Sequence, residues 1–130
     1  MSLLDREIEF RGIYNNVDIQ YFTFENVNSN RLFFRELGLW KDLDKCKIDR
    51  YTGLKDQINK NKVYEHDIIN HMRFGFLVVE WNYRETGWVC ISKTFSKIWL
   101  VDVLLQGGIK VGNIYKNPEL IKDRIGKGLI

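Results

Sequence analysis

Alternation of apolar and polar side chains is the main pattern in this chain, and it predicts short β-strands. Residues 6–11 alternate in the way that is typical of a half-buried strand. Asn15 and Asn16 predict a tight turn, because asparagine tolerates a positive φ. Alternation resumes over residues 17–21. We therefore expect an N-terminal β-hairpin.

A different spacing follows this hairpin. Phe33 and Leu37 are four residues apart, which is the spacing of one helical face. Asn28 or Ser29 is suited to cap a helix at its start, and Gly38 is suited to end it. The pattern predicts a short helix in this part of the chain.

The second half returns to strands separated by turns. We expect strands at residues 63–72, 74–81, 87–92, 95–99 and 109–115. The apolar run at residues 100–106 is too compact for a long strand and is followed by two glycines, so it predicts one helical turn. Five short strands with a helical turn before the last are the layout of a small SH3-like barrel.

The end of the chain predicts a further short helix. Asn117 is a suitable cap, and Pro118 fits the first helical position. The apolar residues expected to dock this helix are Leu120, Ile121 and Ile125. The fold class is therefore mainly β (α+β), with an SH3-like small β-barrel in the C-terminal half. We divide the chain into an N-terminal hairpin and short-helix segment packed on the barrel (residues 1–50), the barrel core (51–116) and a C-terminal helix and tail (117–130).

Composition supports a sheet-rich fold. The chain has 130 residues, of which 45% are hydrophobic and 14% aromatic. A fold of this size buries about 65% of its unfolded surface, which is enough for a core without a metal or a disulfide. The high aromatic fraction favours strands whose large rings fill that core.

Charge gives only a weak indication of the partner. Net charge is +3, from 20 basic and 17 acidic residues, which is too balanced to indicate nucleic acid on its own. The excess is concentrated in residues 41–62, with seven basic and four acidic side chains, and in residues 110–130, with five and two. We favour lysines that keep turns and a tail soluble over a phosphate-binding face.

The cysteines and the start of the chain indicate the compartment. Cys46 and Cys90 have no paired spacing, so a disulfide scaffold is not expected. The start is acidic and alternating, unlike a signal peptide, and apolar runs fall short of membrane-spanning length. We expect a cytoplasmic protein.

Two segments carry a family resemblance. The first, residues 51–69, reads YTGLKDQINKNKVYEHDII, and the second, residues 111–120, reads VGNIYKNPEL. Together with the opening REIEFRGIY at residues 6–14, they resemble the YopX-like proteins of bacteriophages and prophages of Gram-positive bacteria. The intervening residues 17–49 carry no family signature.

The resemblance implies a β-rich barrel, a phage or prophage origin and a role inside the bacterial host cell. It implies no reaction, because the family offers none to carry over. One departure is visible at His66, where the family pattern has glycine. If a turn there requires a positive φ, histidine costs about 1 kcal/mol or more. The backbone at His66 is therefore either ordinary, or strained with the strain offset elsewhere.

Residues suited to catalysis are scarce. His66 and His71 are five apart, which places them on opposite faces of a strand and argues against a metal pair. Buried or inert thiols are favoured over nucleophiles. Asp67 is expected to accept backbone hydrogen bonds and fix a turn. Asn113 is expected to make a local side-chain bond. We predict that the protein is not an enzyme and has no metal or cofactor.

Aromatic residues near a basic loop are the strongest binding candidates. Trp81, Tyr83 and Trp88 lie on or beside predicted strands, with Arg84 in the loop between them. Such a set can stack nucleobases or line a peptide groove. The alternative, which we favour, is that Trp81 and Trp88 pack on each other across a hairpin.

Two lysines complete the candidate set, and two classes of function follow. Lys60 and Lys62 belong to the basic 41–62 segment. The favoured function is a phage accessory protein that acts through protein contacts or as a homo-oligomer, without a membrane or a small-molecule cofactor. The alternative is a nucleic-acid-binding accessory factor of phage replication or lysogeny. An enzyme is a remote third.

Overall fold

The protein folds as two compact units, residues 1–53 and 54–130, in a computed structural model that describes residues 8–124. Each unit has its own buried cluster.

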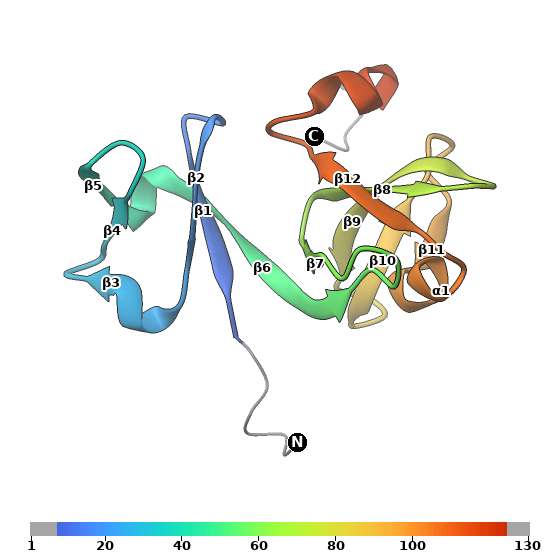
Figure 1. Ribbon diagram of the computed structural model, residues 1–130, viewed down its shortest axis with the longest axis horizontal. Coiled ribbons are helices and arrows are strands. Elements are labelled where there is room, and N and C mark those ends of the chain that lie inside the picture. Colours follow the sequence, from blue (N-terminus) through green and yellow to red (C-terminus); the bar gives the residue numbers. More distant parts are fainter. Residues whose placement is uncertain (1–7, 125–130) are drawn as a thin grey trace, which may run out of the picture. The chain divides into compact units, whose positions relative to one another are not determined.

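Unit 1 is built from two small antiparallel sheets (Figure 1). In the first sheet β1 lies between β2 and β6, and the second has the order β3-β4-β5. The elements are β1 (Phe10–Tyr14), β2 (Asp18–Phe22), the 3₁₀ turn η2 (Phe24–Asn26), β3 (Val27–Asn28), β4 (Arg31–Phe34), β5 (Leu39–Asp42), the 3₁₀ turn η3 (Leu43–Lys45) and β6 (Cys46–Lys55).

The N-terminal hairpin is confirmed. β1 and β2 pair antiparallel, and the turn residues Asn15 and Asn16 have φ values of 54° and 61°. The Val17 N–H closes the turn on the carbonyl of Tyr14 at 3.2 Å. The first strand begins at Phe10, later than the alternation at residues 6–11 predicts, and residues 6 and 7 lie outside the described residues.

The short helix predicted after residue 28 is wrong. Ser29 and Asn30 form a hairpin turn with φ values of 52° and 60°, and β4 follows at once. Leu32 and Phe34 are buried on one face of β4, while Phe33 between them is exposed. Burial of alternate residues requires a strand, and this requirement overrides the helical spacing of Phe33 and Leu37.

Trp40 lies on β5 directly opposite Phe33. Their rings are 5.4 Å apart on the outer face of the small sheet. The inner face contributes Leu32 and Phe34, which pack with Phe22 as the buried cluster of unit 1.

Unit 2 contains one five-stranded antiparallel sheet of order β11-β10-β9-β8-β12, which curls as half of a barrel (Figure 1). Unit 2 begins with the last two residues of β6, and β7 pairs with β6. The elements are β7 (Lys62–Tyr64), β8 (Asp67–His71), β9 (Gly75–Asn82), β10 (Gly87–Ile91), β11 (Lys97–Trp99), α1 (Leu100–Leu105), β12 (Ile109–Asn113) and the 3₁₀ segment η4 (Pro118–Arg124).

The predicted strands and helical turn of the second half correspond closely to these elements, although the first predicted strand is divided into β7 and β8. The helical turn is α1, and it covers the main core. This core comprises Val63, Ile69, Leu77, Val79, Cys90, Leu100, Val103 and Leu104.

The C-terminal segment docks in part as predicted. It begins at Pro118 but is formed by 3₁₀ turns with a kink at Ile121, so a regular helix is a correction. Ile121 is fully buried against Ile68 and Val78, with Leu120 half-buried beside it. Ile125, the third expected docking residue, lies outside the described residues. No helix within residues 8–124 is long and apolar enough to cross a bilayer.

Candidate functional site

Four candidate residues lie together at one end of the β9–β10 hairpin. Trp81 and Trp88 are opposite each other in register, and their rings meet edge to face with centroids 5.1 Å apart. Tyr83 is 80% exposed and lies 6.4 Å from the Trp81 ring, and Arg84 is exposed in the same turn. The tryptophans therefore pack across the hairpin, as favoured from the sequence, and leave Tyr83 and Arg84 at the surface.

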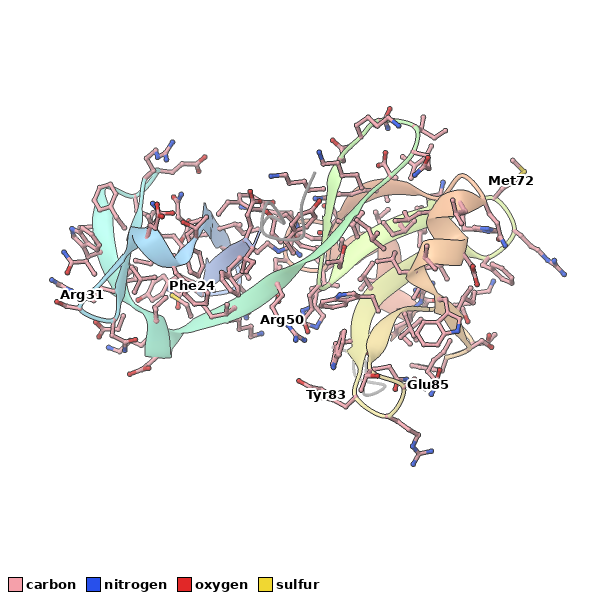
Figure 2. All side chains as sticks on the ribbon, turned by 90° about the horizontal axis from the view of Figure 1, so that it is seen from below. Phe24, Arg31, Arg50, Met72, Tyr83 and Glu85 are labelled. Carbon is pink, nitrogen blue, oxygen red and sulfur yellow. The ribbon has the colours of Figure 1, made fainter. Side chains whose placement is uncertain are left out.

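The two lysine candidates lie elsewhere in unit 2. Lys60 is in the loop between β6 and β7, with a φ of 59°, and the backbone carbonyl of Lys62 accepts a hydrogen bond from Lys110 Nζ at 2.9 Å. Figure 2 shows the loop at residues 56–61 on the opposite side of this unit from Tyr83. The structure therefore does not join the lysines and the aromatic residues into one surface.

The motif carboxylates fix the backbone. Asp67 is buried, and its Oδ2 accepts the Tyr64 N–H at 2.7 Å, which confirms the turn-fixing role predicted for it. Asp56 is also buried and accepts the N–H groups of Asn59 at 2.7 Å and of Lys110 at 3.1 Å. Both side chains are therefore held by structural bonds.

The two motif asparagines make local bonds as well. Asn113 Oδ1 accepts the N–H groups of Tyr115 at 3.0 Å and of Lys116 at 2.9 Å, which confirms its predicted role. Asn117 Oδ1 accepts the N–H of Asn113 at 3.2 Å, so the side chain points back toward β12. The predicted use of Asn117 as a side-chain helix cap is replaced by this bond.

His66, at the position where the family pattern has glycine, adopts a left-handed backbone conformation. Its φ is 68°, its N–H donates to the Val79 carbonyl at 2.7 Å, and its carbonyl accepts the Ile114 N–H at 3.1 Å. The sequence left two alternatives open, and the backbone here is the strained one, fixed by hydrogen bonds to two other segments. Burial raises the pKa of the nearby Glu80 carboxyl. Interaction with His66 lowers this pKa, and interaction with Glu65 raises it.

Neither thiol is activated as a nucleophile. Burial raises the pKa of Cys90 to about 12. Burial also raises the pKa of Cys46. Interaction with Asp42 raises this pKa further, and interaction with Lys41 lowers it. Because the thiolate is the reactive form, both cysteines are poor nucleophiles at neutral pH. Within residues 8–124, no group of three His, Cys, Asp or Glu side chains is arranged to hold a metal ion.

An apolar groove of about 340 Å³ lies on unit 1. It is lined by Phe10, Phe22, Phe24, Val27, Leu43 and Ile48. The Phe10 ring stacks on Phe22 at 5.5 Å and meets Phe24 edge to face at 4.9 Å. Phe24, on η2, is 70% exposed (Figure 2). The groove thus presents aromatic faces to solvent, and five of its six lining residues lie within residues 17–49, which carry no family signature.

A second hollow, of about 510 Å³, lies on unit 2 between the β8–β9 turn, the loop after β10 and η4. We call it the η4 pocket. It is lined by Met72, Arg73, Phe74, Gly75, Phe76, Lys93, Glu119, Leu120, Lys122, Asp123 and Arg124. Burial lowers the pKa of the Arg124 guanidinium, and Asp123 acts in the opposite direction.

Neither hollow was identified from the sequence. The groove joins side chains from β1, β2, η2, β3, η3 and β6, so its members are separated along the chain and show no local motif. For the groove, the available sequence signal is the set of three aromatic rings within residues 21–24. For the η4 pocket, the signal is the basic excess of residues 110–130, which contributes Lys122 and Arg124 to its lining.

Comparison with known proteins agrees with the sequence motifs. No curated protein matches the chain. The profile of the family described as "YopX protein" matches residues 8–122, which include both units and both motif segments. The chain therefore belongs to the YopX protein family.

Proposed function

We propose that this protein is a non-catalytic, phage- or prophage-encoded accessory module that self-associates through the apolar groove of unit 1. The observation that carries this proposal is the groove itself, with Phe24 exposed over 70% of its surface. Contiguous exposed apolar patches of this kind are uncommon on monomers and mark interaction surfaces.

The small core of unit 1 also supports association. Among the described residues, this unit buries only four apolar side chains, which are Ile13, Phe22, Leu32 and Phe34. It exposes nine large ones, including Phe24, Trp40 and Ile48. Small folds with few buried side chains depend on oligomerisation or on other added contacts for their stability.

Charges around the groove favour a second copy of the chain as its occupant. Glu25 and Asp44 are acidic and exposed, and Lys45 and Lys47 are basic and exposed. Glu25, Asp44 and Lys47 directly neighbour the groove residues Phe24, Leu43 and Ile48 along the chain, and Lys45 is two residues from Leu43. A two-fold contact brings the same surface together from both copies, so a rim with both signs can pair with itself. A partner whose surface carries mainly one sign of charge would not complement this mixed rim.

The remaining parts of the proposal follow from the family and the chemistry. The motif carboxylates and asparagines bond to the backbone, and both thiols are held in the unreactive form. These observations support an accessory role without a reaction or a cofactor. We assign the curled sheet of unit 2 to the SH3-like barrels, and we place the protein in the host cytoplasm, on the resemblance to phage proteins.

Sedimentation velocity over a wide concentration range tests the self-association. The wild-type protein is expected to change from monomer to dimer as its concentration rises. Phe24→Asp and Ile48→Asp are expected to hold it as a monomer, because each places a charge in the apolar contact. Ile58→Asp is the matched control, since Ile58 is 60% exposed and lies in the other unit.

Two results would overturn the proposal. One is a wild-type protein that stays monomeric at every concentration. The other is a dimer that both groove variants leave intact. Far-UV circular dichroism of each variant checks that the fold is retained, so that loss of the dimer is not mistaken for unfolding.

Nucleic-acid binding is the second candidate, and the tip of the β9–β10 hairpin favours it. Tyr83 offers an exposed ring for base stacking, with Arg84 beside it. Binding to random oligonucleotides at two salt concentrations tests this candidate. Affinity for duplex DNA is expected to fall by about 0.9 log units per log unit of salt for each phosphate contact. Absence of binding at low salt would eliminate this candidate.

A further inference from the structure

The η4 pocket contains a buried cation without a full set of partners. The side chain of Arg124 is only 4% exposed, yet its Nε and Nη1 have no hydrogen-bond partner among the described residues. Asp123 approaches Nε at 3.6 Å, which is beyond hydrogen-bond distance, and its side chain is 59% exposed. Buried guanidinium N–H groups normally have acceptors, so the pocket offers donors to an anion.

Other charges of the pocket have the same sign as Arg124. Arg73, Lys93 and Lys122 are exposed cations in its lining, and they are opposed there only by Glu119 and Asp123 among the lining residues. The pocket is therefore net positive around a buried guanidinium. The planar guanidinium binds phosphate oxygens through two parallel hydrogen bonds, which a lysine cannot reproduce.

One side of the pocket is apolar. Phe74, Phe76 and Leu120 are half-buried lining residues, and the Arg73 guanidinium lies 5.5 Å from the centre of the Phe74 ring. Met72 is fully exposed and projects from the β8–β9 turn at the pocket edge (Figure 2). A volume of about 510 Å³ falls in the range of small-molecule sites rather than of an extended groove.

We propose that the η4 pocket binds a small organic phosphate. The phosphate accepts hydrogen bonds from the guanidinium of Arg124, and Arg73 adds charge at the rim. The organic part lies against Phe74, Phe76 and Leu120. The site is distinct from the groove of unit 1, so it stands or falls independently of self-association.

The β8–β9 turn that carries Arg73 is itself well fixed. His71 Nδ1 accepts the N–H groups of Arg73 at 3.0 Å and of Phe74 at 3.3 Å, and His71 Nε2 contacts Gln106 Oε1 at 2.8 Å. Two N–H donors at Nδ1 require that nitrogen to be unprotonated, so the proton is on Nε2. The turn therefore presents Arg73 and Phe74 from a preorganised backbone.

Isothermal titration calorimetry at low salt, with adenosine monophosphate and inorganic phosphate as probes, tests the proposal. Adenosine monophosphate is expected to bind one site per chain, and phosphate is expected to compete for it with lower affinity. Arg124→Met is expected to weaken the nucleotide roughly tenfold to a hundredfold, the loss that removing hydrogen bonds to a charged group produces. Arg73→Gln is expected to weaken it several-fold.

Control variants separate this effect from a loss of fold or of general charge. Arg84→Gln removes an exposed arginine from another hairpin turn and is expected to leave the affinity unchanged. Arg73 is exposed, so its replacement tests the pocket without disturbing the core. Arg124→Lys keeps the charge but loses the planar fork, and an intermediate affinity is expected.

Three outcomes would overturn the proposal. The first is no binding of either probe at low salt. The second is binding that Arg124→Met and Arg73→Gln both leave unchanged. The third is a single-stranded oligonucleotide that binds more tightly than adenosine monophosphate and loses affinity in the same variants, which would assign the pocket to a polymer.

Discussion

Asp67 and Lys110 form a salt bridge between β8 and β12, with Lys110 Nζ 3.0 Å from the buried Asp67 Oδ2. The same ammonium donates to the Lys62 carbonyl and lies over the ring of Tyr64 at 5.5 Å. The backbone N–H of Lys110 donates to Asp56. Lys110 thus ties Asp56 and Asp67 of the first family segment to β12, the strand with which the second segment (residues 111–120) begins.

Breaking this arrangement should destabilise unit 2. Asp67→Asn is expected to lower the free energy of unfolding by about 3 kcal/mol, because it removes one partner of a buried ion pair and leaves Lys110 uncompensated. Urea denaturation followed by circular dichroism measures the change. Glu119→Gln, at an exposed acid in the same unit, is the control and should change it by less than about 0.5 kcal/mol. An Asp67→Asn variant as stable as this control would contradict the structural role.

Gly112 is required by its closeness to Asn117. A Cβ at position 112 would collide with the Asn117 side-chain amide, whose Oδ1 bonds the Asn113 N–H. Gly112→Ala is therefore expected to cost about 1–3 kcal/mol by overpacking. Asn117→Ala removes the two closest atoms and leaves its Cβ at 3.1 Å. Gly112→Ala should therefore cost much less in the Asn117→Ala background than in the wild type. Additive losses in urea denaturation would show that the steric explanation is wrong.

Local pattern was sufficient to predict most of unit 2. Turn residues such as Gly107 punctuate its strands, and β8, β9 and β10 each contain a short run of adjacent buried apolar residues, so both signals agree. In residues 28–40 the signals conflict. Phe33 and Leu37 have helical spacing, whereas burial selects Leu32 and Phe34, and only tertiary packing decides between them.

The sites divide in the same way, into contacts that local sequence pattern predicts and contacts that only tertiary packing creates. The Trp81–Trp88 contact is a cross-strand pair, so the register of one hairpin predicts it. The groove gathers Phe10, Phe24 and Ile48 from segments far apart along the chain, and no periodicity reveals such a meeting. The basic tail looked like a solubilising feature, although it contains the buried Arg124.

The left-handed backbone at His66 gives a paired prediction. His66→Gly and His66→Ala both lose the ring and its contact with the Tyr115 hydroxyl at 3.4 Å. They differ in backbone preference, because glycine adopts a φ of 68° without the steric cost that alanine incurs. His66→Gly should therefore be more stable than His66→Ala by about 1 kcal/mol in urea denaturation. Equal stability of the two variants would show that the backbone is not strained there.

The buried thiol of Cys90 gives a prediction for pH dependence. Its pKa is raised from the ordinary 9.0 to about 12 in the folded state, so the folded protein holds a proton that the unfolded chain releases. The contribution to stability is fully present below the unfolded pKa and is lost as pH rises toward the folded value. Relative to Cys90→Ala, the wild type should lose about 1 kcal/mol of unfolding free energy between about pH 8 and about pH 10.

The comparison with Cys90→Ala isolates the thiol from other groups that titrate in this range. Urea denaturation at both pH values gives the two differences, and native-state alkylation gives an independent measure. Because the thiolate is the reactive form, Cys90 should be alkylated only as the protein unfolds. Equal pH dependence of the two proteins, together with rapid alkylation of native Cys90, would show that this thiol ionises in the folded state.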